Sequence, residues 1–441
     1  MRLQLQSELQ VARQSAVSRT IPLTILVFED SQVAKLAPVT TARAACAVTM
    51  GSYRLLDLIQ SLDHPTALLL RKHLRQIYAL DEPFLGLEKC VLGVDSPRSQ
   101  PVLALNARLI PSLANLKAIR RLLAPDTPAG VVRAGDQIAA VVRPDWDLGG
   151  LAETDSALRE ALDASLALPS IESDLKMVSL PHEVVAANMQ VIGDNLEHRI
   201  ATDKYKQQTD GVFLAGGATL GEHIVTDTSS GPIVIDEDAK VGPYTLLTGP
   251  VYVGRGCRIL EHAAIKDEVS LGHTTKVGGE VEAAVIEPYT NKQHHGFLGH
   301  SYLGSWINLG AGTCNSDLKN TYGTVNMEYG SSKTATGMQF LGCVMGDYSK
   351  SAINTGIFTG KVIGVCSMMY GFVTSNVPSF VNYARLFGQL ATLPPEVMIA
   401  TQKRMFSRRK VEQRECDIQL MHDMYRLTQA ERDKFGDEIV F

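Results

Sequence analysis

Two polar segments of the chain carry residues that could do chemistry. The first, residues 291–296, contains adjacent histidines at positions 294 and 295. A neutral imidazole near pH 7 can act as a general base, although a histidine in a polar loop is more often structural or merely exposed. The histidine pair also suggests a metal ligand, but no carboxylate or cysteine stands beside it at ligand spacing. The second segment, residues 314–336, contains Asn315, Lys319, Asn320 and Tyr322.

Both segments interrupt an aliphatic repeat of period six. The repeat runs through Ile235, Val241, Leu247, Val253, Ile259, Ile265, Leu271 and Val277. A period of six fits neither an amphipathic helix nor an alternating strand. It predicts a left-handed parallel β-helix, in which each hexad forms one side of a triangular coil and the aliphatic side chain points inward. The hexads resume at Phe297, Leu303 and Leu309, and again at Met345, Ser351, Ile357, Ile363 and Met369.

The first half of the chain shows a different pattern. Short apolar runs at residues 23–28 and 102–105 predict buried strands, residues 52–62 and 112–123 have helical spacing, and residues 131–142 look like a hairpin. Strands that alternate with helices indicate an α/β domain with a mostly parallel sheet. Ligands of such sheets bind at the carboxyl ends of the strands, which directs attention to Asn106 and to the loop after Phe28.

Length and composition indicate the number of domains and the classes of protein that can be excluded. A chain of 441 residues predicts about three domains, and its net charge of −5 argues against bulk nucleic-acid binding. We expect a flexible extension (1–20), an α/β domain (21–205), a β-helix (211–385) and a helical C-terminal tail (393–441). No stretch is apolar and long enough to cross a membrane, and the first residues lack the apolar core of a secretory signal. Seven scattered cysteines predict a reducing cytoplasm and no structural zinc.

The stretch 294–323 resembles the acetyltransferase domain of the bifunctional GlmU family. That family carries H-L-T-Y-L-G, then N-I-G-A-G-T, then C-N-Y-D-G, and residues 294–299, 308–313 and 314–317 stand in the same order here. The order of domains also matches. The whole chain is still more similar to GlmU-like sugar nucleotidyltransferases of Bacteroidetes and related bacteria, which share N-K-x-H-x-G-F-L-G and the segment 346–355.

The resemblance implies acetyl transfer from acetyl-coenzyme A to an amino sugar phosphate, with His294 as the base. Asn308 and Asn315 align with residues that bind the sugar or complete the site, and Lys319 and Tyr322 are candidates for binding the sugar phosphate. Two other interpretations stay open. For Asn308 the alternative is a structural role in an asparagine ladder at a coil corner. For Lys319 the alternative is an ordinary solvated lysine in a loop.

The coenzyme is expected along the β-helix, in a strip that includes Ser349 and Ser351. Ordinary corner residues of the coil are the alternative for both serines. Because this family binds the coenzyme at the seam between subunits, the resemblance also implies a homotrimer. One departure concerns the acceptor: Glu280 and Glu282 stand where the family has a basic residue for the phosphate, although Lys292 could replace the missing charge.

The first domain departs further from GlmU. Nucleotidyl transfer needs a Gly-rich loop, cations and magnesium on a carboxylate, and the family motif L-x-x-G-x-G-T-R-M is not intact. The resemblance places Arg43 against phosphate and Asn106 where a metal-binding aspartate stands, with Asn188 as a possible second ligand. An amide binds magnesium less well than a carboxylate because it lacks charge.

We therefore predict a GlmU-like sugar-phosphate transferase, with acetyl transfer at the β-helix and nucleotidyl transfer from a nucleoside triphosphate as a secondary activity. Two alternatives remain. One is an acyltransferase whose first domain only binds a nucleotide sugar. The other is a non-catalytic scaffold that binds a nucleotide sugar.

Overall fold

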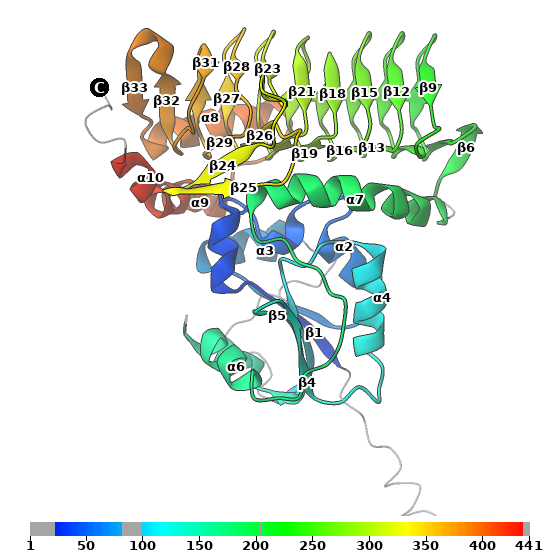
Figure 1. Ribbon diagram of the computed structural model, residues 1–441, viewed down its shortest axis with the longest axis vertical. Helices are drawn as coiled ribbons and strands as arrows, with labels where there is room; N and C mark the ends of the chain where they lie inside the picture. Colours follow the sequence, from blue (N-terminus) through cyan, green and yellow to red (C-terminus); the bar gives the residue numbers. More distant parts are fainter. Residues whose placement is uncertain (1–22, 82–98, 153, 155, 203, 435–441) are drawn as a thin grey trace, which may run out of the picture.

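The computed structural model describes residues 23–81, 99–152, 154, 156–202 and 204–434. The expected flexible extension, residues 1–20, lies outside the described residues. The structure consists of an α/β part, a long β-helix and a helical tail, which confirms the predicted fold class (Figure 1).

The α/β part contains a five-stranded sheet with the order β2-β1-β3-β5-β4. Its strands are β1 (Thr24–Phe28), β2 (Thr66–Leu69), β3 (Gln100–Asn106), β4 (Gly130–Ala134) and β5 (Gln137–Trp146). Strand β1 is parallel to its neighbours β2 and β3, whereas β5 is antiparallel to both of its neighbours. The sheet is therefore mixed: β1, β2 and β3 are parallel as predicted, and β4 and β5 form the hairpin predicted for residues 131–142.

Burial on both faces explains the continuous apolar sequence of β1. Ile25 and Val27 join one hydrophobic cluster, while Leu26 and Phe28 join another on the opposite face. The predicted helices are present as α2 (Leu55–Gln60) and α4 (Leu113–Leu122). The Ser112 side chain caps α4 by accepting a hydrogen bond from the backbone N–H of Asn115.

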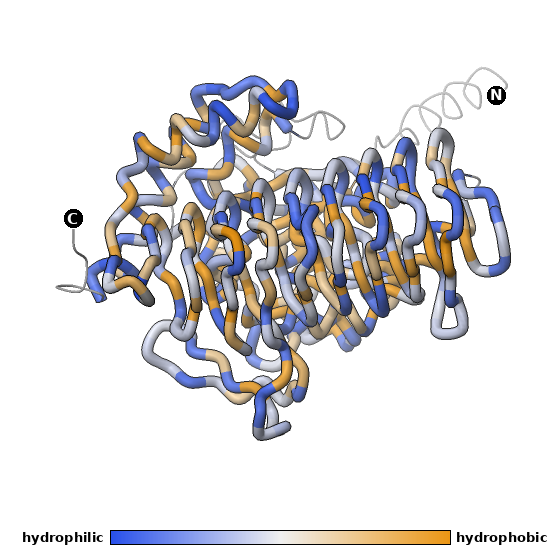
Figure 2. The backbone as a smooth tube through the Cα atoms, turned by 90° about the horizontal axis from the view of Figure 1, so that it is seen from above, coloured by the Kyte–Doolittle hydropathy of each residue, from blue (hydrophilic) through white to orange (hydrophobic). Residues whose placement is uncertain are grey.

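The β-helix stacks equivalent short strands every eighteen residues along its first coils. β10 (Ile233–Ile235), β13 (Val251–Val253) and β16 (Val269–Leu271) pair in parallel, with Ile235 opposite Val253 and Val253 opposite Leu271. All eight aliphatic residues of the predicted repeat are at most 3% exposed. Hydrophobic segments recur from coil to coil in Figure 2, as expected when each coil buries the same positions.

After the first interruption one strand departs from the predicted register by one residue, whereas Leu303 and Leu309 are buried as predicted. In β21 (Phe297–Gly299) the buried side chain is Leu298, which pairs with Val281, whereas Phe297 pairs with Glu280. The inward position predicted for Phe297 is therefore wrong. A shift of one residue exchanges the two faces of a strand, and the irregular loop before β21 allows it.

The long helix α7 (Pro181–Ile200) connects the two main parts and lies between them (Figure 1). Its Asn188 donates a hydrogen bond to the backbone oxygen of Glu268 in the β-helix, at 2.6 Å. The predicted helical tail comprises α8 (Pro395–Arg408), α9 (Glu415–Leu427) and α10 (Gln429–Asp433). Within the described part of the chain, no helix has the length and apolarity needed to cross a membrane.

Candidate functional site

The site whose geometry best suits proton transfer lies at a corner of the β-helix, between β21 and β22 (Tyr302–Leu303). His300 occupies this corner with a positive φ of 43° and is 8% exposed. Its backbone N–H donates to the carbonyl of Glu282, and its carbonyl accepts from the N–H of Gly342, both at 2.9 Å. Hydrogen bonds to two neighbouring coils thus fix a backbone conformation that is uncommon for a side chain of this size.

The imidazole of His300 pairs with the carboxylate of Asp317. Nδ1 lies 2.9 Å from Oδ2, and the ring stacks on Phe340 with centroids 5.3 Å apart. A carboxylate on Nδ1 fixes the tautomer and the orientation of an imidazole, and it stabilises the imidazolium that forms on protonation. Within the described residues, Nε2 of His300 makes no hydrogen bond and so can accept a proton from a ligand.

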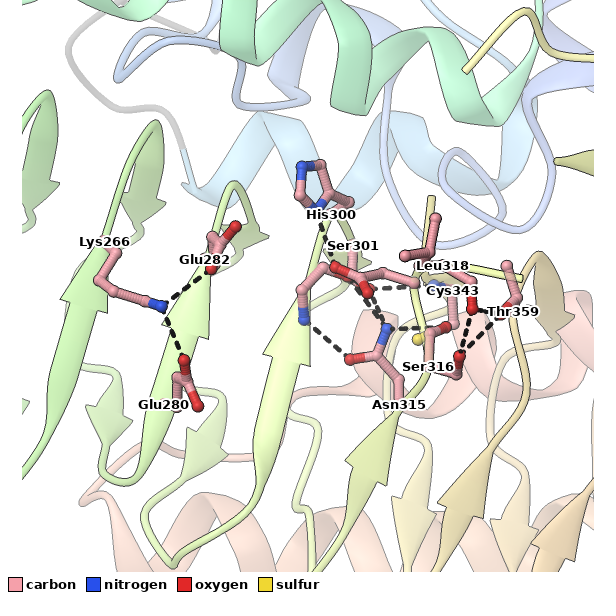
Figure 3. Close-up of polar contacts among 12 residues, drawn as sticks. Lys266, Glu280, Glu282, His300, Ser301, Asn315, Ser316, Leu318, Cys343 and Thr359 are labelled. Atoms are coloured by element: carbon pink, nitrogen blue, oxygen red, sulfur yellow. Dashed lines mark hydrogen bonds and ion pairs between the residues drawn. The ribbon is translucent and has the colours of Figure 1, made fainter. Parts of the chain in front are cut away.

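Asn315 fixes the backbone on both sides of His300 (Figure 3). Its Oδ1 accepts from the N–H of Gly299 at 2.8 Å. Its Nδ2 donates to the carbonyl of Gly299 at 3.0 Å and to Oγ of Ser301 at 3.2 Å. Asn315 was predicted to bind the sugar or complete the site, and in the structure its amide positions the histidine corner.

The close packing at this corner requires glycine at position 342. A Cβ there would lie 2.1 Å from Nδ2 of Asn315 and 2.2 Å from both the carbonyl of Gly299 and Oγ of Ser301. These distances are far below van der Waals contact, so any larger residue would displace the amide that holds the corner.

Charged residues surround the corner on the preceding coils. Lys266 binds Glu280 at 2.7 Å and Glu282 at 3.0 Å (Figure 3), and the bond to Glu280 helps raise its pKa to about 12. Burial and the charge of Glu282 raise the pKa of Asp267. Two carboxylates therefore share one ammonium, which leaves the local charge negative, as the sequence suggested for Glu280 and Glu282.

The predicted base His294 lies elsewhere. Its side chain is exposed, and Nε2 contacts the amide of Gln293 at 3.1 Å. Below it, Lys292 is 2% exposed and donates to the carbonyls of Gly278, His294 and Gly296 at 2.7, 3.0 and 2.7 Å. All three N–H bonds of the ammonium are thus used, which leaves none for a phosphate. Burial also lowers the pKa of Lys292 to about 8.

Asn308, Lys319 and Tyr322 are not brought together with His294 by any contact in the described residues. Asn308 is exposed and accepts a hydrogen bond from Asn291 at 3.4 Å, an arrangement that fits the asparagine ladder. The Lys319 ammonium donates to the carbonyl of Thr324 at 2.7 Å. Tyr322 is 69% exposed and is free to meet a ligand.

Ser349 and Ser351, predicted near the coenzyme, take part in hydrogen bonds within the coils. The Ser349 hydroxyl donates to the carbonyl of Gly364 at 2.7 Å. The Ser351 hydroxyl lies 2.7 Å from that of Thr313 and accepts from the N–H of Gly310 at 3.1 Å. Both serines are buried, which fits the alternative of corner residues.

Arg43 links the α/β part to the β-helix. It contacts Glu287 at 3.0 Å, Ser305 at 2.8 Å and the carboxylate of Asp347. Glu287 also accepts two hydrogen bonds from Thr49, both at 2.9 Å. Two carboxylates thus neutralise the guanidinium that was predicted to face phosphate, and this placement favours a structural role.

Asn106 lies at the carboxyl end of β3, fully buried, beside a carboxylate that the sequence did not single out. Its amide donates to Asp30 at 2.9 Å and to the carbonyl of Ile138 at 2.9 Å. Arg108 binds both oxygens of Asp30, at 3.1 and 2.6 Å. Because the guanidinium already neutralises Asp30, these residues do not fit a magnesium ion. Asn188, the other proposed ligand, instead accepts from the N–H of Gly51 at 2.8 Å.

A cavity of about 970 Å³ opens beside these residues, at the carboxyl ends of β1 and β2. Its lining includes Asp30, Gln32, Arg71, Lys72 and His73. The position agrees with the expectation that ligands of the sheet bind after Phe28.

The sequence reasoning missed His300 and Asp317. Their separation of seventeen residues was the available signal, because it is close to one eighteen-residue coil and places the two residues on adjacent coils. The preceding loop made that spacing hard to use, since it changes the register.

Comparison with known proteins gives two kinds of match. Residues 25–202 match a family described as sugar nucleotidyl transferase. The bifunctional protein GlmU of Acidithiobacillus ferrooxidans is 34% identical over 122 residues, which cover 26% of this chain and 26% of that protein. GlmU of Alkalilimnicola ehrlichii is 34% identical over 110 residues, covering 24% of this chain and 23% of that protein. The chain thus spans about a quarter of the length of these relatives.

Among solved structures, UDP-N-acetylglucosamine acyltransferase of Francisella novicida is 15% identical and covers 48% of this chain and 90% of that chain. Its TM-score is 0.23. The chain is therefore similar to the sugar nucleotidyl transferase family over residues 25–202, and to GlmU over about a quarter of its length.

Proposed function

We propose that this protein is a transferase that moves an acyl group from a coenzyme A thioester to the amino group of a sugar, with His300 as the general base. The observation that carries the proposal is the pair formed by Nδ1 of His300 and Oδ2 of Asp317, at 2.9 Å. The similarity to GlmU, a bifunctional protein, supports the same class of activity.

In the proposed reaction, the free nitrogen Nε2 of His300 acts as the base. As the amine attacks the thioester carbonyl, Nε2 takes a proton from the amine and the imidazolium stays paired with Asp317. The new C–N bond then replaces the C–S bond, and the coenzyme leaves as a thiolate that takes the proton back from the imidazolium. Acetyl-coenzyme A is the proposed donor.

The charge around the corner favours an amino acceptor. Glu282 pairs with Gly299, so it stands about 5 Å along the β-helix from the strand that leads to His300. Together with Glu280 it outweighs the single positive charge of Lys266. A protonated amino sugar is attracted by this surplus of carboxylates and gives one proton to water before the free amine attacks, whereas a phosphate held here is repelled. We place any phosphate of the acceptor away from Glu280 and Glu282.

For the α/β part we propose binding of a nucleotide or nucleotide sugar in the 970 Å³ cavity, without nucleotidyl transfer. The bidentate pairing of Arg108 with Asp30 favours this second function over catalysis, because it removes the carboxylate best placed for a metal. Pyrophosphate release from any nucleoside triphosphate and sugar 1-phosphate in the presence of magnesium would contradict it.

We also propose that the working unit is a cytoplasmic homotrimer. A mass in solution of three times the 47.9 kDa chain, measured by light scattering, would support this assembly. A monomeric mass in an active preparation would exclude it.

The test of the acyltransferase uses purified protein, acetyl-coenzyme A and a panel of amino sugars, with release of free thiol as the readout. His300→Ala should lower kcat at least about 100-fold, the usual contribution of a general base. His294→Ala tests the base predicted from the sequence, and His223→Ala, at another exposed position, is the matched control. Loss of activity in His294→Ala with normal activity in His300→Ala would reject the proposed base. Absence of thiol release from the unmodified protein with every acceptor would reject the acyltransferase itself.

A further inference from the structure

A second cavity, about 930 Å³ in volume, lies where the three parts of the chain meet. The α/β part contributes Thr49 and Tyr53, the β-helix contributes Tyr289, and the tail contributes Phe406. Neither His300 nor any residue of its corner lines this cavity. We call it the interdomain cleft.

One wall of the cleft is a row of residues from successive coils. His273, Tyr289 and Trp306 follow the consecutive strands β16, β19 (Val285–Ile286) and β22 of one sheet. Tyr289 and Trp306 stack with centroids 4.2 Å apart and planes 3° from parallel, and Phe406 packs on Trp306 at 4.5 Å. This column gives the cleft a rigid wall.

One end of the cleft is cationic. Arg255 is exposed, and its guanidinium makes no ion pair or hydrogen bond with the described residues. It lies close enough to His273 to help burial lower the pKa of that histidine to about 4. The acidic groups nearby are engaged: Asp236 binds Lys204 at 2.7 Å, and Asp57 binds Arg54 at 2.7 Å. An uncompensated guanidinium at the mouth of a cavity is suited to an anion, above all a phosphate.

The other end holds two buried polar atoms without partners. Asp347 is 2% exposed, and its Oδ1 accepts from the N–H of Ser305 at 2.9 Å and pairs with Arg43. Its Oδ2 and Nε of Arg43 have no hydrogen-bond partner in the part of the chain that the structure describes. A buried carboxylate oxygen needs a donor and a buried N–H needs an acceptor, and one hydroxyl group can satisfy both.

The two ends are separated by a distance that suits one small molecule. The backbones of Arg255 and Asp347 follow strands four coils apart, β13 and β26 (Cys343–Met345), or about 19 Å along the β-helix. Their charged groups approach one another: the Asp347 carboxylate binds the N–H of Ser305, and the Arg255 guanidinium lies near His273. Ser305 and His273 follow strands two coils apart, which corresponds to about 10 Å. A single sugar ring with a phosphate group spans a similar length.

We infer that the interdomain cleft binds a phosphorylated monosaccharide, with the phosphate at Arg255 and hydroxyl groups at Asp347 and Arg43. Such a ligand contacts both the α/β part and the β-helix. Its site is distinct from the corner at His300, so the inference does not depend on the proposed acyl transfer.

The chain offers a direct optical test, because it has only two tryptophans and one of them, Trp306, lines the cleft. The other, Trp146, lies in β5 and lines neither cavity. In the Trp146→Phe variant, titration with glucosamine 1-phosphate should change the fluorescence of Trp306 with saturation. Trp306→Phe, which keeps Trp146, should show no such change.

Arg255→Ala, made in the Trp146→Phe background, should raise the Kd for glucosamine 1-phosphate at least about tenfold, as expected for loss of one charge-assisted contact. Arg258→Ala is the matched control, because Arg258 is an exposed cation three residues away that does not line the cleft. Unphosphorylated glucosamine should bind more weakly than its phosphate and be insensitive to Arg255→Ala. His300→Ala should leave the titration unchanged.

Three results would overturn the inference. One is an unchanged Trp306 signal together with no heat of binding at millimolar ligand. Another is an equal loss of affinity in the Arg255 and Arg258 variants. The third is a titration that His300→Ala abolishes, because the signal would then come from the other site.

Discussion

Nδ1 of His300 and Oδ2 of Asp317 lie 2.9 Å apart, and the two residues come from different, adjacent coils. The relationship resembles the carboxylate–imidazole arrangement of many general bases, in which the carboxylate orients the ring. It leads to a first prediction about the role of Asp317.

Asp317→Asn keeps the size of the side chain but removes the charge that stabilises the imidazolium. We expect kcat for acyl transfer to fall by between ten- and a thousandfold, with little change in KM, because Asp317 acts through His300. Steady-state kinetics with varied amino sugar measure both constants. Asp238→Asn, on an exposed corner of the β-helix, is the control. A rise in KM with normal kcat would show that Asp317 binds substrate instead.

Asn315 and Gly342 form one packed unit, and changing either should loosen the His300 corner. Asn315→Ala leaves the N–H of Gly299 without its partner, so we expect a loss of about 1–3 kcal/mol in the free energy of unfolding. Gly342→Ala places a methyl group 2.1 Å from Nδ2 of Asn315 and should cost a similar amount. Chemical denaturation measures both changes. Additive losses in the double variant would argue that the two residues are not coupled.

Arg43 should be important for stability because two buried carboxylates depend on it. Arg43→Met leaves Glu287 and Asp347 without their common cation, and we expect a loss of about 3–5 kcal/mol. Adding Glu287→Gln to Arg43→Met should recover part of that loss. Lys35→Met, at an exposed position of the same part, should change stability by less than about 0.5 kcal/mol. A small effect of Arg43→Met alone would contradict the structural role.

His273 should make stability depend on pH between about 4 and 6.5. Burial lowers its pKa from the ordinary 6.5 to about 4, with a contribution from Arg255. In this window the unfolded chain binds a proton that the folded protein does not, so stability falls as the pH falls. The difference amounts to about 3 kcal/mol at most.

His273→Asn removes this titration. The free energy of unfolding of the variant, measured at pH 7 and pH 4, should fall less than that of the unmodified protein. His262→Asn, at an exposed corner, serves as the control. Equal losses in the His273 variant and the unmodified protein would show that His273 does not titrate as described.

The sequence by itself determined the β-helix, because period and burial are tied together in this fold. Each aliphatic residue of the hexads, from Ile235 to Val277, must face the same interior, and a six-residue interval has no other regular explanation. It also predicted β1 and β3, since strands buried on both faces are continuously apolar.

Only the tertiary structure decided which polar residues meet. His300 and Asp317 come together because coils stack, and Arg43 reaches Glu287 because α7 holds the α/β part against the β-helix. Each charged side chain is paired with groups from distant parts of the chain, and such pairing leaves no periodic signal in the sequence. For this reason Arg43 and Lys292 looked available for phosphate in the sequence, although in the fold carboxylates and carbonyls occupy them.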